Sequence, residues 1–423
     1  MVKKYYFLLK IVSSILYTTR ELNIHGERGS MTGADLAGQA WLPLQGLRVL
    51  DFTSLLPGPL ATLNLADLGA DVVKVEPPLG DPARRMFPDM YRAVNRNKRS
   101  VVLDLKREEV LPVVGQLASR SDVAIEGFRV GVAERLRVDY RSMAARNPGL
   151  VYCSLSGYGQ TGPDRLRPGH DLNFLSRAGA LSLSGHWGRK PCRSGLPIAD
   201  MAGAGFAVIA ILAALQERRL TGRGAFLDLS LAEATVFLAA VRHGLDFEGR
   251  DQSHLSPTND LFETADGERI GLGVVEQHFW NKFVKAAVDL DPELSDSRYA
   301  EEEGRRRHGD ELSARLRGVM RLRPAAEWLQ LFERFDVPAE LVVTPAVASR
   351  TAQMKAREMV MEMEGERHMP FPIRVDGRRG AALRGTAPAL GAHTDSVLAE
   401  LGFDPAEIDE LRKAGVFGTE TSI

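Results

Sequence analysis

The strongest constraint on the fold is an alternation, from residue 47 onward, of short apolar runs with stretches of helical pattern. The runs that predict β-strands are Leu47–Phe52, Asp71–Glu76, Ser100–Leu105, Asp122–Phe128, Leu150–Leu155 and Phe226–Leu229. Because neighbouring parallel strands need a crossover connection, usually a helix, this order predicts an α/β fold with a mostly parallel, doubly wound, Rossmann-type sheet.

The turn after the first predicted strand, residues 53–59, reads Thr-Ser-Leu-Leu-Pro-Gly-Pro. A dinucleotide site of the usual kind needs glycines at this turn, so that the backbone can approach a pyrophosphate. The G-x-G-x-x-G pattern is missing from this turn. We therefore expect no NAD site of the typical kind.

Composition shifts along the chain predict the domain organisation. Residues 245–260 are polar and rich in turn formers, which is typical of a linker, and a hairpin followed by helices extends from there to about residue 335. We predict a large Rossmann-type domain over 41–245 and a small α+β domain over 246–335. The remaining residues, 336–423, are predicted to return, complete the small domain and pack on the large one.

The first forty residues do not continue this pattern. Their apolar stretch is interrupted by Lys10, is too short and charged to span a bilayer, and lacks a typical cleavage site. We predict that residues 1–40 form an extension outside the fold, with Met31 as the true start or the leader dispensable.

Composition excludes several classes of protein. The 423 residues carry a formal net charge of −1, whereas a nucleic-acid-binding protein needs a net basic face. The two cysteines, Cys153 and Cys192, cannot form a disulfide framework or a cysteine-rich metal site. We expect a cytoplasmic protein without a metal, a nucleic-acid partner or a membrane anchor.

Two short strings carry candidate chemistry. Gly169-His170-Asp171 places an imidazole in a turn, and Asp200 stands where a long apolar helix, residues 202–215, begins. Titratable groups at the ends of such elements suit proton abstraction or nucleophilic attack. The plainer alternatives are that Asp200 is a helix N-cap, that His170 is a turn residue and that Asp171 caps the helix after it. We expect the 202–215 helix to be buried on every side.

Several motifs occur together in the order and spacing of one family. They are Leu47–Asp51 with Pro57-Gly58-Pro59, Leu68–Glu76, Gly80-Asp81-Pro82, Asn97–Ser100, Leu103–Lys106, Gly157–Pro163 and Leu390–Asp395. On these motifs the chain resembles the class III CoA-transferase family from about residue 43 to 416. That family includes formyl-CoA transferase, carnitine CoA-transferase and α-methylacyl-CoA racemase, and the site motifs are most similar to those of the racemase.

The resemblance implies an acyl-CoA substrate, bound as coenzyme A thioester near the interface of a large and a small domain. It also implies a C-terminal segment that returns to the large domain, and a homodimer of two interlocked monomers. No metal and no NAD are implied.

The resemblance also assigns catalytic roles. Asp200 aligns with the carboxylate that transferases use as a nucleophile, forming an aspartyl-CoA thioester, and with one of the two racemase bases. His170 matches the other racemase base, at a position where transferases usually carry an aromatic residue. Glu276 resembles the glutamate that racemases place against this histidine, although residues 245–262 before it depart from the racemase pattern.

CoA-binding residues follow from the same resemblance. Arg129 matches a racemase arginine, and Arg135 is expected to reach a phosphate. Many relatives have an arginine where this chain has Pro77, and Arg84, Lys98 or Arg99 could replace it. The residues expected near the adenine end are Leu103, Asp104, Leu105, Lys106 and Phe128.

Two reactions are open at this point. Racemisation of a 2-methylacyl-CoA needs two bases on opposite faces of the α-carbon, and N–H donors that hold the enolate, which the helix start at Asp200 could supply. CoA transfer between carboxylic acids needs Asp200 alone, and His170 would then be a bystander. A non-enzymatic CoA-binding role is a third possibility.

Overall fold

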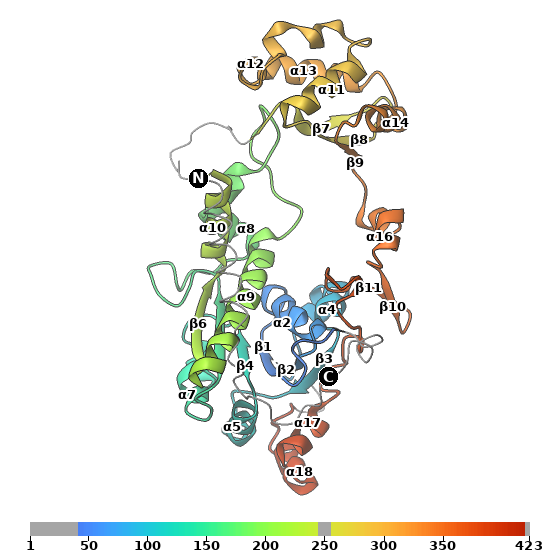
Figure 1. Cartoon of the computed structure of the whole chain (residues 1–423). Helices are drawn as coiled ribbons and strands as arrows, with labels where there is room; N and C mark the ends of the chain where they lie inside the picture. The colour runs from blue at the N-terminus through green and yellow to red at the C-terminus, as the bar shows by residue number, and fades with distance from the viewer. Residues whose placement is uncertain (1–40, 244–254, 419–423) are drawn as a thin grey trace, which may run out of the picture. The chain divides into compact units, whose positions relative to one another are not determined.

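A computed structural model describes residues 41–243 and 255–418 of the chain (Figure 1). The predicted N-terminal extension, residues 1–40, and much of the predicted linker lie outside the described residues. The proposed boundaries at 245 and 335 stay predictions.

The large sheet contains six parallel strands in the order β3-β2-β1-β4-β5-β6. The strands are β1 (Arg48–Phe52), β2 (Asp71–Glu76), β3 (Lys98–Val102), β4 (Val123–Glu126), β5 (Val151–Ser156) and β6 (Ala225–Ser230). The predicted mixed α/β fold with a parallel sheet is confirmed. The chain reverses its direction of travel across the sheet between β1 and β4, where ligands of such sheets bind.

Helices cover both faces of this sheet. The helices of this part of the chain are α2 (Pro57–Asp67), α3 (Ala83–Met86), α4 (Pro88–Asn95), α5 (Leu111–Ser119), α6 (Val132–Arg135), α7 (Tyr140–Ala144), α8 (Asp171–Arg177), α9 (Ile198–Thr221) and α10 (Leu231–His243), with short 3₁₀ turns at Glu108–Val110 and Ala180–Leu183. One core cluster packs α2 and α9 against the strands, and a second packs α5 together with two C-terminal helices, α17 (Thr394–Leu401) and α18 (Pro405–Lys413). Figure 1 shows α17 and α18 near α5.

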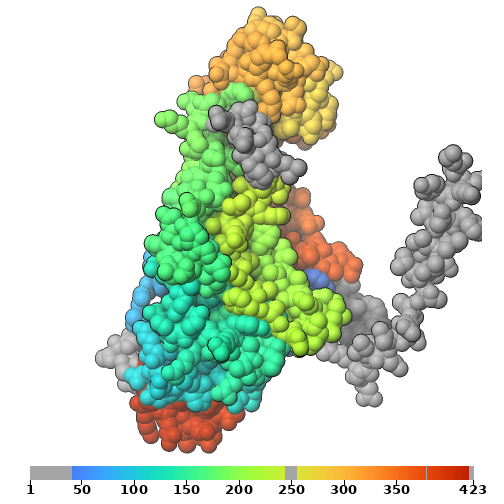
Figure 2. Space-filling model, turned by 90° about the vertical axis from the view of Figure 1, so that its left-hand side faces the viewer, coloured from blue at the N-terminus to red at the C-terminus, as the bar shows by residue number. Residues whose placement is uncertain are grey.

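Helix α9 differs from its prediction. Its buried residues, such as Ala204, Ala207 and Ile211, follow one stripe, whereas Ile209 is 62% exposed and Leu220 82% exposed. The expectation that this helix is buried on every side is therefore wrong for the single chain, because only one side contacts the sheet. Figure 2 shows α9 and α10 as a broad yellow-green band on the surface. By length and composition α9 could cross a membrane, but 44% of its most apolar window is buried in the protein.

A second, smaller sheet is antiparallel, with strands β7 (Asn259–Glu263), β8 (Arg269–Gly273) and β9 (Ala339–Leu341). Its core is built with α11 (Gln277–Ala287), α13 (Gly309–Met320) and α14 (Ala325–Phe335). The other elements here are α12 (Glu302–Arg307) and 3₁₀ turns at Pro292–Ser295 and Ser297–Tyr299.

The segment between β9 and α17 is made of short elements: α15 (Pro345–Ala348), α16 (Ala352–Ala356), and the strand pairs β10 (Met361–Met363) with β11 (Glu366–His368) and β12 (Arg374–Val375) with β13 (Arg378–Arg379). It returns the chain toward the large sheet, where the Asn97 side chain donates to the carbonyl of Ala382 at 2.9 Å.

Candidate active site

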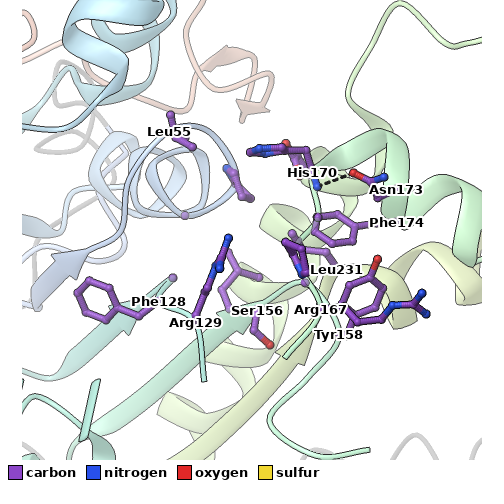
Figure 3. A pocket seen from close by; sticks show the side chains of 18 of the residues that line it. Leu55, Phe128, Arg129, Ser156, Tyr158, Arg167, His170, Asn173, Phe174 and Leu231 are labelled. Atoms are coloured by element: carbon purple, nitrogen blue, oxygen red, sulfur yellow. Dashed lines mark hydrogen bonds between the residues drawn. The ribbon is translucent and has the colours of Figure 1, made fainter. Parts of the chain in front are cut away.

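A cavity of about 560 Å³ opens at the carboxyl ends of β1, β4 and β5, beside the switch point of the sheet. His170 and Asp200 both line it. Figure 3 shows His170, Leu55 and Arg129 around this cavity, each from a different loop. The other polar side chains of the lining are Thr53, Ser54, Ser156, Tyr158, Arg165, Arg167 and Asn173.

His170 is fixed by a compact turn at the start of α8. Its N–H donates to Asn173 Oδ1 at 3.1 Å, and its carbonyl accepts from the Asn173 N–H at 2.8 Å. Phe174 packs edge-on against Tyr158 with 5.2 Å between ring centroids. A Cβ at Gly169 would stand 2.6 Å from the Phe174 ring, so that only glycine lets the backbone before His170 pass over the ring.

Asp200 is the third residue of α9, whose N-cap position is Pro197. The N-cap alternative for Asp200 is therefore wrong. Asp171 Oδ1 instead accepts the N–H of Ala199 at 2.8 Å and, more weakly, that of Asp200 at 3.4 Å. The expectation that Asp171 caps its own helix is also wrong, since it is the first residue of α8 and caps α9. One carboxylate thus joins the two helix starts that carry His170 and Asp200.

The environment of Asp200 keeps its carboxyl easy to protonate. Burial disfavours the ionised form, the negative charge of Asp171 adds to this effect, and together they raise the pKa of Asp200 to about 7. A carboxyl with a pKa near the working pH can both accept and return a proton. The site is therefore equipped for proton transfer as well as for nucleophilic attack.

We expect kcat/KM to depend on pH through Asp200. Because the ionised carboxylate is the base or nucleophile, activity should fall about tenfold per pH unit below pH 7. Above pH 7 CoA transfer should level off, whereas two-base racemisation should fall again where its proton donor is lost. Asp171→Asn keeps an acceptor oxygen for the α9 N–H groups but removes the negative charge, so the midpoint should move to lower pH. A pH–rate profile measures both, with the distant surface change Asp289→Asn as control. An unshifted midpoint in Asp171→Asn would contradict this electrostatic account.

The N–H donors expected at the start of α9 are already engaged. Those of Ala199 and Asp200 donate to Asp171, and that of Met201 donates to the carbonyl of Pro197 at 3.0 Å. The expectation that this helix start holds an enolate is therefore wrong. Positive charge is available instead from three arginines that line the cavity, Arg129, Arg165 and Arg167.

The loop after β1 forms one wall of the cavity in an unusual backbone conformation. Leu55 has φ of 63°, which is costly for a residue with a side chain. Its N–H donates to Asp81 Oδ1 at 3.1 Å, and the buried Lys74 pairs with Asp81 at 3.0 Å while donating to the Thr53 carbonyl at 2.8 Å. A fully buried ion pair thus holds this wall in place.

The residues predicted to bind CoA fall into two groups. Phe128 and Arg129 follow β4 and line the cavity. Leu103, Leu105 and Phe128 belong to one apolar cluster, in which Leu103 is only 1% exposed. Asp104 accepts the N–H of Lys106 at 3.2 Å, and Lys106 and Arg135 are exposed. Residues 103–106 and Arg135 do not line the cavity, so their CoA contacts stay a prediction.

The three candidates to replace the family arginine at Pro77 are engaged elsewhere. Arg84 makes two bonds to the Glu76 carboxylate, at 2.8 and 2.7 Å, and a third to the Pro388 carbonyl at 3.1 Å. Lys98 is buried against Asp51 at 3.1 Å, and Arg99 pairs with Asp71 at 2.6 Å. Arg84 is thus engaged inside the fold, and its contact with CoA stays a prediction.

Glu276 stands apart from the other two predicted catalytic residues. It is the exposed N-cap residue of α11 and does not line the cavity. Over residues 41–243 and 255–418 no hydrogen bond or ion pair joins Glu276 to His170. The predicted support of the imidazole by this carboxylate stays a prediction.

Sequence reasoning missed Asn173 and Phe174, which fix the His170 turn. A polar residue three positions after a helix N-cap is a capping signal, so Asn173 could have been found. Phe174 could not, because its role depends on contact with Gly157 and Gly169. Within the described residues, no group of three or more His, Cys, Asp or Glu side chains is arranged to hold a metal ion.

The strand order and a cavity with an imidazole and a carboxyl at the switch point define a Rossmann-type α/β protein with a candidate catalytic centre. The family model for CoA-transferase family III matches residues 44–394. The chain belongs to this family, as its motifs predicted.

Curated relatives include both reaction types. The chain is 32% identical over 378 residues to the alpha-methylacyl-CoA racemase of Mus musculus, covering 87% of this chain and 96% of the relative. It is 33% identical over 369 residues to the acetyl-CoA:oxalate CoA-transferase of Acetobacter aceti, covering 82% of this chain and 93% of the relative. Members of the family are enzymes that act on CoA thioesters.

Among solved structures, a CAIB/BAIF family protein from Brucella suis matches with a TM-score of 0.77 and 30% identity, covering 86% of this chain and all of that one. This match supports the mixed α/β architecture independently of the site.

Proposed function

We propose that this protein racemises or epimerises a 2-methylacyl-CoA by two-base proton transfer between His170 and Asp200. The observation that carries the proposal is that these two side chains, from different helix starts, line one cavity of about 560 Å³. Transferases of the family usually have an aromatic residue in place of His170. An imidazole there supplies a second base.

In the proposed reaction one group, acting as base, takes the α-proton, and the electron pair of the C–H bond moves into the thioester to form an enolate. The other group, in its protonated form, returns a proton to the opposite face of the same carbon. The arginines lining the cavity favour the negative charges of the enolate and of the CoA phosphates. The pKa of Asp200, raised to about 7 by burial, suits it to both half-reactions.

Isotope exchange tests this proposal. Incubation with a 2-methylacyl-CoA in deuterated water should place deuterium at the α-carbon and interconvert the two epimers, as followed by mass spectrometry and NMR. No uptake across a panel of 2-methylacyl-CoA substrates would contradict racemisation.

CoA transfer between carboxylic acids through Asp200 is the second candidate. CoA transfer is favoured by the position of Glu276, which does not line the cavity that contains His170. Within the chain, the histidine of the racemase arrangement therefore lacks its supporting glutamate. Asp200 would attack the thioester carbonyl, and the thiolate of CoA would leave. The thiolate would then attack the aspartyl carbonyl of the mixed anhydride, which gives the aspartyl-CoA thioester and releases the donor acid as its carboxylate. Hydroxylamine should trap that thioester at Asp200 when acyl-CoA is supplied, and no trapping would contradict it.

We also propose that the protein is a cytoplasmic homodimer whose ligand is acyl-CoA, with no metal, NAD, nucleic-acid or membrane partner. The support for a dimer is the exposed apolar face of α9 and α10, where Ile209 is 62% exposed and Val241 69% exposed. Both described cysteines are free thiols, which fits a reducing compartment.

Light scattering should give about twice the chain mass of 46.4 kDa. The double variant Ile209→Asp/Val241→Asp places two charges on that face and should shift the protein toward the single-chain mass, because burying unpaired charges is costly. Glu217→Gln, an exposed polar change on α9, is the matched control. A monomeric wild type would contradict the dimer, and a fully dimeric double variant would exclude this face as its interface.

A further inference from the structure

A second pocket, of about 300 Å³, lies on the small sheet, separate in its lining from the cavity that contains His170 and Asp200. Charged side chains dominate it. Its lining residues are His186, Arg189, Asp260, Leu261, Glu263, Arg269, Arg317 and Arg321. Four guanidinium groups against two carboxylates leave two positive charges in a small volume.

Both carboxylates of this pocket already have partners. Asp260 lies 2.5 Å from His186 Nδ1 and accepts the N–H groups of Trp187 at 3.1 Å and Leu261 at 2.7 Å. Glu263 pairs with Arg321 at 3.2 Å. The acidic side chains are therefore occupied by the loop at 186–187 and by Arg321.

Two of the four arginines differ from these paired side chains in their surroundings. Arg269 begins β8 and the half-buried Arg317 lies on α13, so regular elements set the position of each. Neither side chain has a hydrogen-bond or ion-pair partner in the part of the chain that the structure describes. Like charges brought together without an acceptor between them repel, which is relieved when an anion binds between them.

We propose that this pocket binds a phosphate dianion, either free inorganic phosphate or the phosphate of a monoester, independently of the acyl-CoA site. The two positive charges in excess match the two negative charges of the ligand. Guanidinium groups bind phosphate oxygens through paired, charge-assisted hydrogen bonds, and Arg269 and Arg317 present two such groups to one small space. A volume of about 300 Å³ holds a phosphate group with a small substituent.

Calorimetric titration of the full-length protein at pH 8 tests the proposal, with inorganic phosphate and glycerol phosphate as separate ligands. Arg269→Gln/Arg317→Gln should weaken phosphate binding at least about tenfold, since two charged hydrogen-bonding groups are lost. Arg307→Gln changes a surface arginine that pairs with Glu303, and this variant should bind phosphate as the wild type does. Tighter binding of glycerol phosphate would identify a monoester as the ligand, and equal binding would identify free phosphate.

Four outcomes would overturn the proposal: no phosphate binding by the wild type, unchanged binding by the double variant, equally tight binding of succinate, or displacement of phosphate by saturating CoA. The last outcome would make the pocket part of the CoA site. The KM of the double variant for acyl-CoA also tests whether the pocket is part of the CoA site. We expect this KM to equal the wild-type value.

Discussion

Replacing His170 with alanine is expected to lower the rate of α-proton exchange by about 10²–10⁴-fold, the usual contribution of a positioned acid–base group. The fold should survive, because the backbone of His170 keeps its bonds with Asn173 and the ring of Phe174 still packs against the turn. The loss would then be chemical. Circular dichroism and the thermal unfolding midpoint should match those of the wild type.

Asp200→Asn provides the companion measurement. Asparagine keeps the size of the side chain but can neither accept the α-proton nor attack a thioester, so exchange and transfer should both fall by a similar factor or more. His278→Ala, which removes an exposed imidazole from the small sheet's helix α11, is the matched control and should leave both activities unchanged.

The pair of variants separates the two candidate reactions. If racemisation is correct, His170→Ala and Asp200→Asn both lose exchange. If CoA transfer is correct, Asp200→Asn abolishes transfer while His170→Ala retains it. Retention of epimerisation by His170→Ala at the wild-type rate would contradict the two-base proposal directly.

The largest expected effect on stability is at Asp51. Asp51→Asn should lower the free energy of unfolding by about 3–5 kcal/mol, because it leaves the buried Lys98 without its counter-charge. Both side chains of this pair are fully buried and lie 3.1 Å apart. Asp51 also accepts the Thr53 N–H at 2.9 Å and the Thr62 hydroxyl at 2.6 Å, so the change weakens the start of the loop that lines the cavity.

Urea unfolding of Asp51→Asn measures this effect. Asp89→Asn is the matched control, since Asp89 is 90% exposed beside Arg92 and a surface pair of this kind contributes little. The second variant Lys98→Met removes the ion-pair partner of the buried Asp51 and should also be less stable than the wild type. A loss below about 1 kcal/mol in both would show that the buried pair is not important for stability.

The Asp51–Lys98 pair also makes the free energy of unfolding depend on pH, and the direction of this dependence follows from the pKa of Asp51. Burial opposes ionisation of Asp51, but Lys98, Lys74 and the bonds from Thr53 and Thr62 outweigh it and hold its pKa well below the usual value. The native state therefore binds this proton less readily than the unfolded chain. Its contribution is complete above the unfolded pKa of about 4 and is lost as the pH falls below it. Wild type and Asp51→Asn should thus converge in stability at strongly acidic pH.

Much of the fold could be predicted from local pattern. The residues of β2 match the predicted run, and the other five strands of the large sheet lie at or within a few residues of their predicted positions. The third strand is shifted to Lys98–Val102 because the chain turns at Leu105 and Lys106, although the Leu103 N–H still donates to the Glu76 carbonyl at 2.9 Å. Ser230 accepts the Glu233 N–H at 3.1 Å, a local bond typical of a serine that precedes a helix.

The candidate site was only partly predictable. Its two central residues, His170 and Asp200, could be named from short motifs, and they do share a cavity. The sequence did not allow us to predict which groups would pair with the charged side chains. Arg84, Lys98 and Arg99 are basic side chains of the kind that bind phosphate, yet each forms an ion pair with a carboxylate of the same chain.

The sequence by itself determined the alternating α/β architecture, the family and the identity of the imidazole and the carboxyl, because these depend on periodicity and on residues a few positions apart. Only the tertiary structure decided that Asp171 caps α9, that α9 keeps an exposed apolar side, and that Glu276 stands apart from His170. The physical reason is that a charged or polar side chain has the same intrinsic chemistry everywhere. What it does depends on burial and on partners that are brought to it from distant parts of the chain.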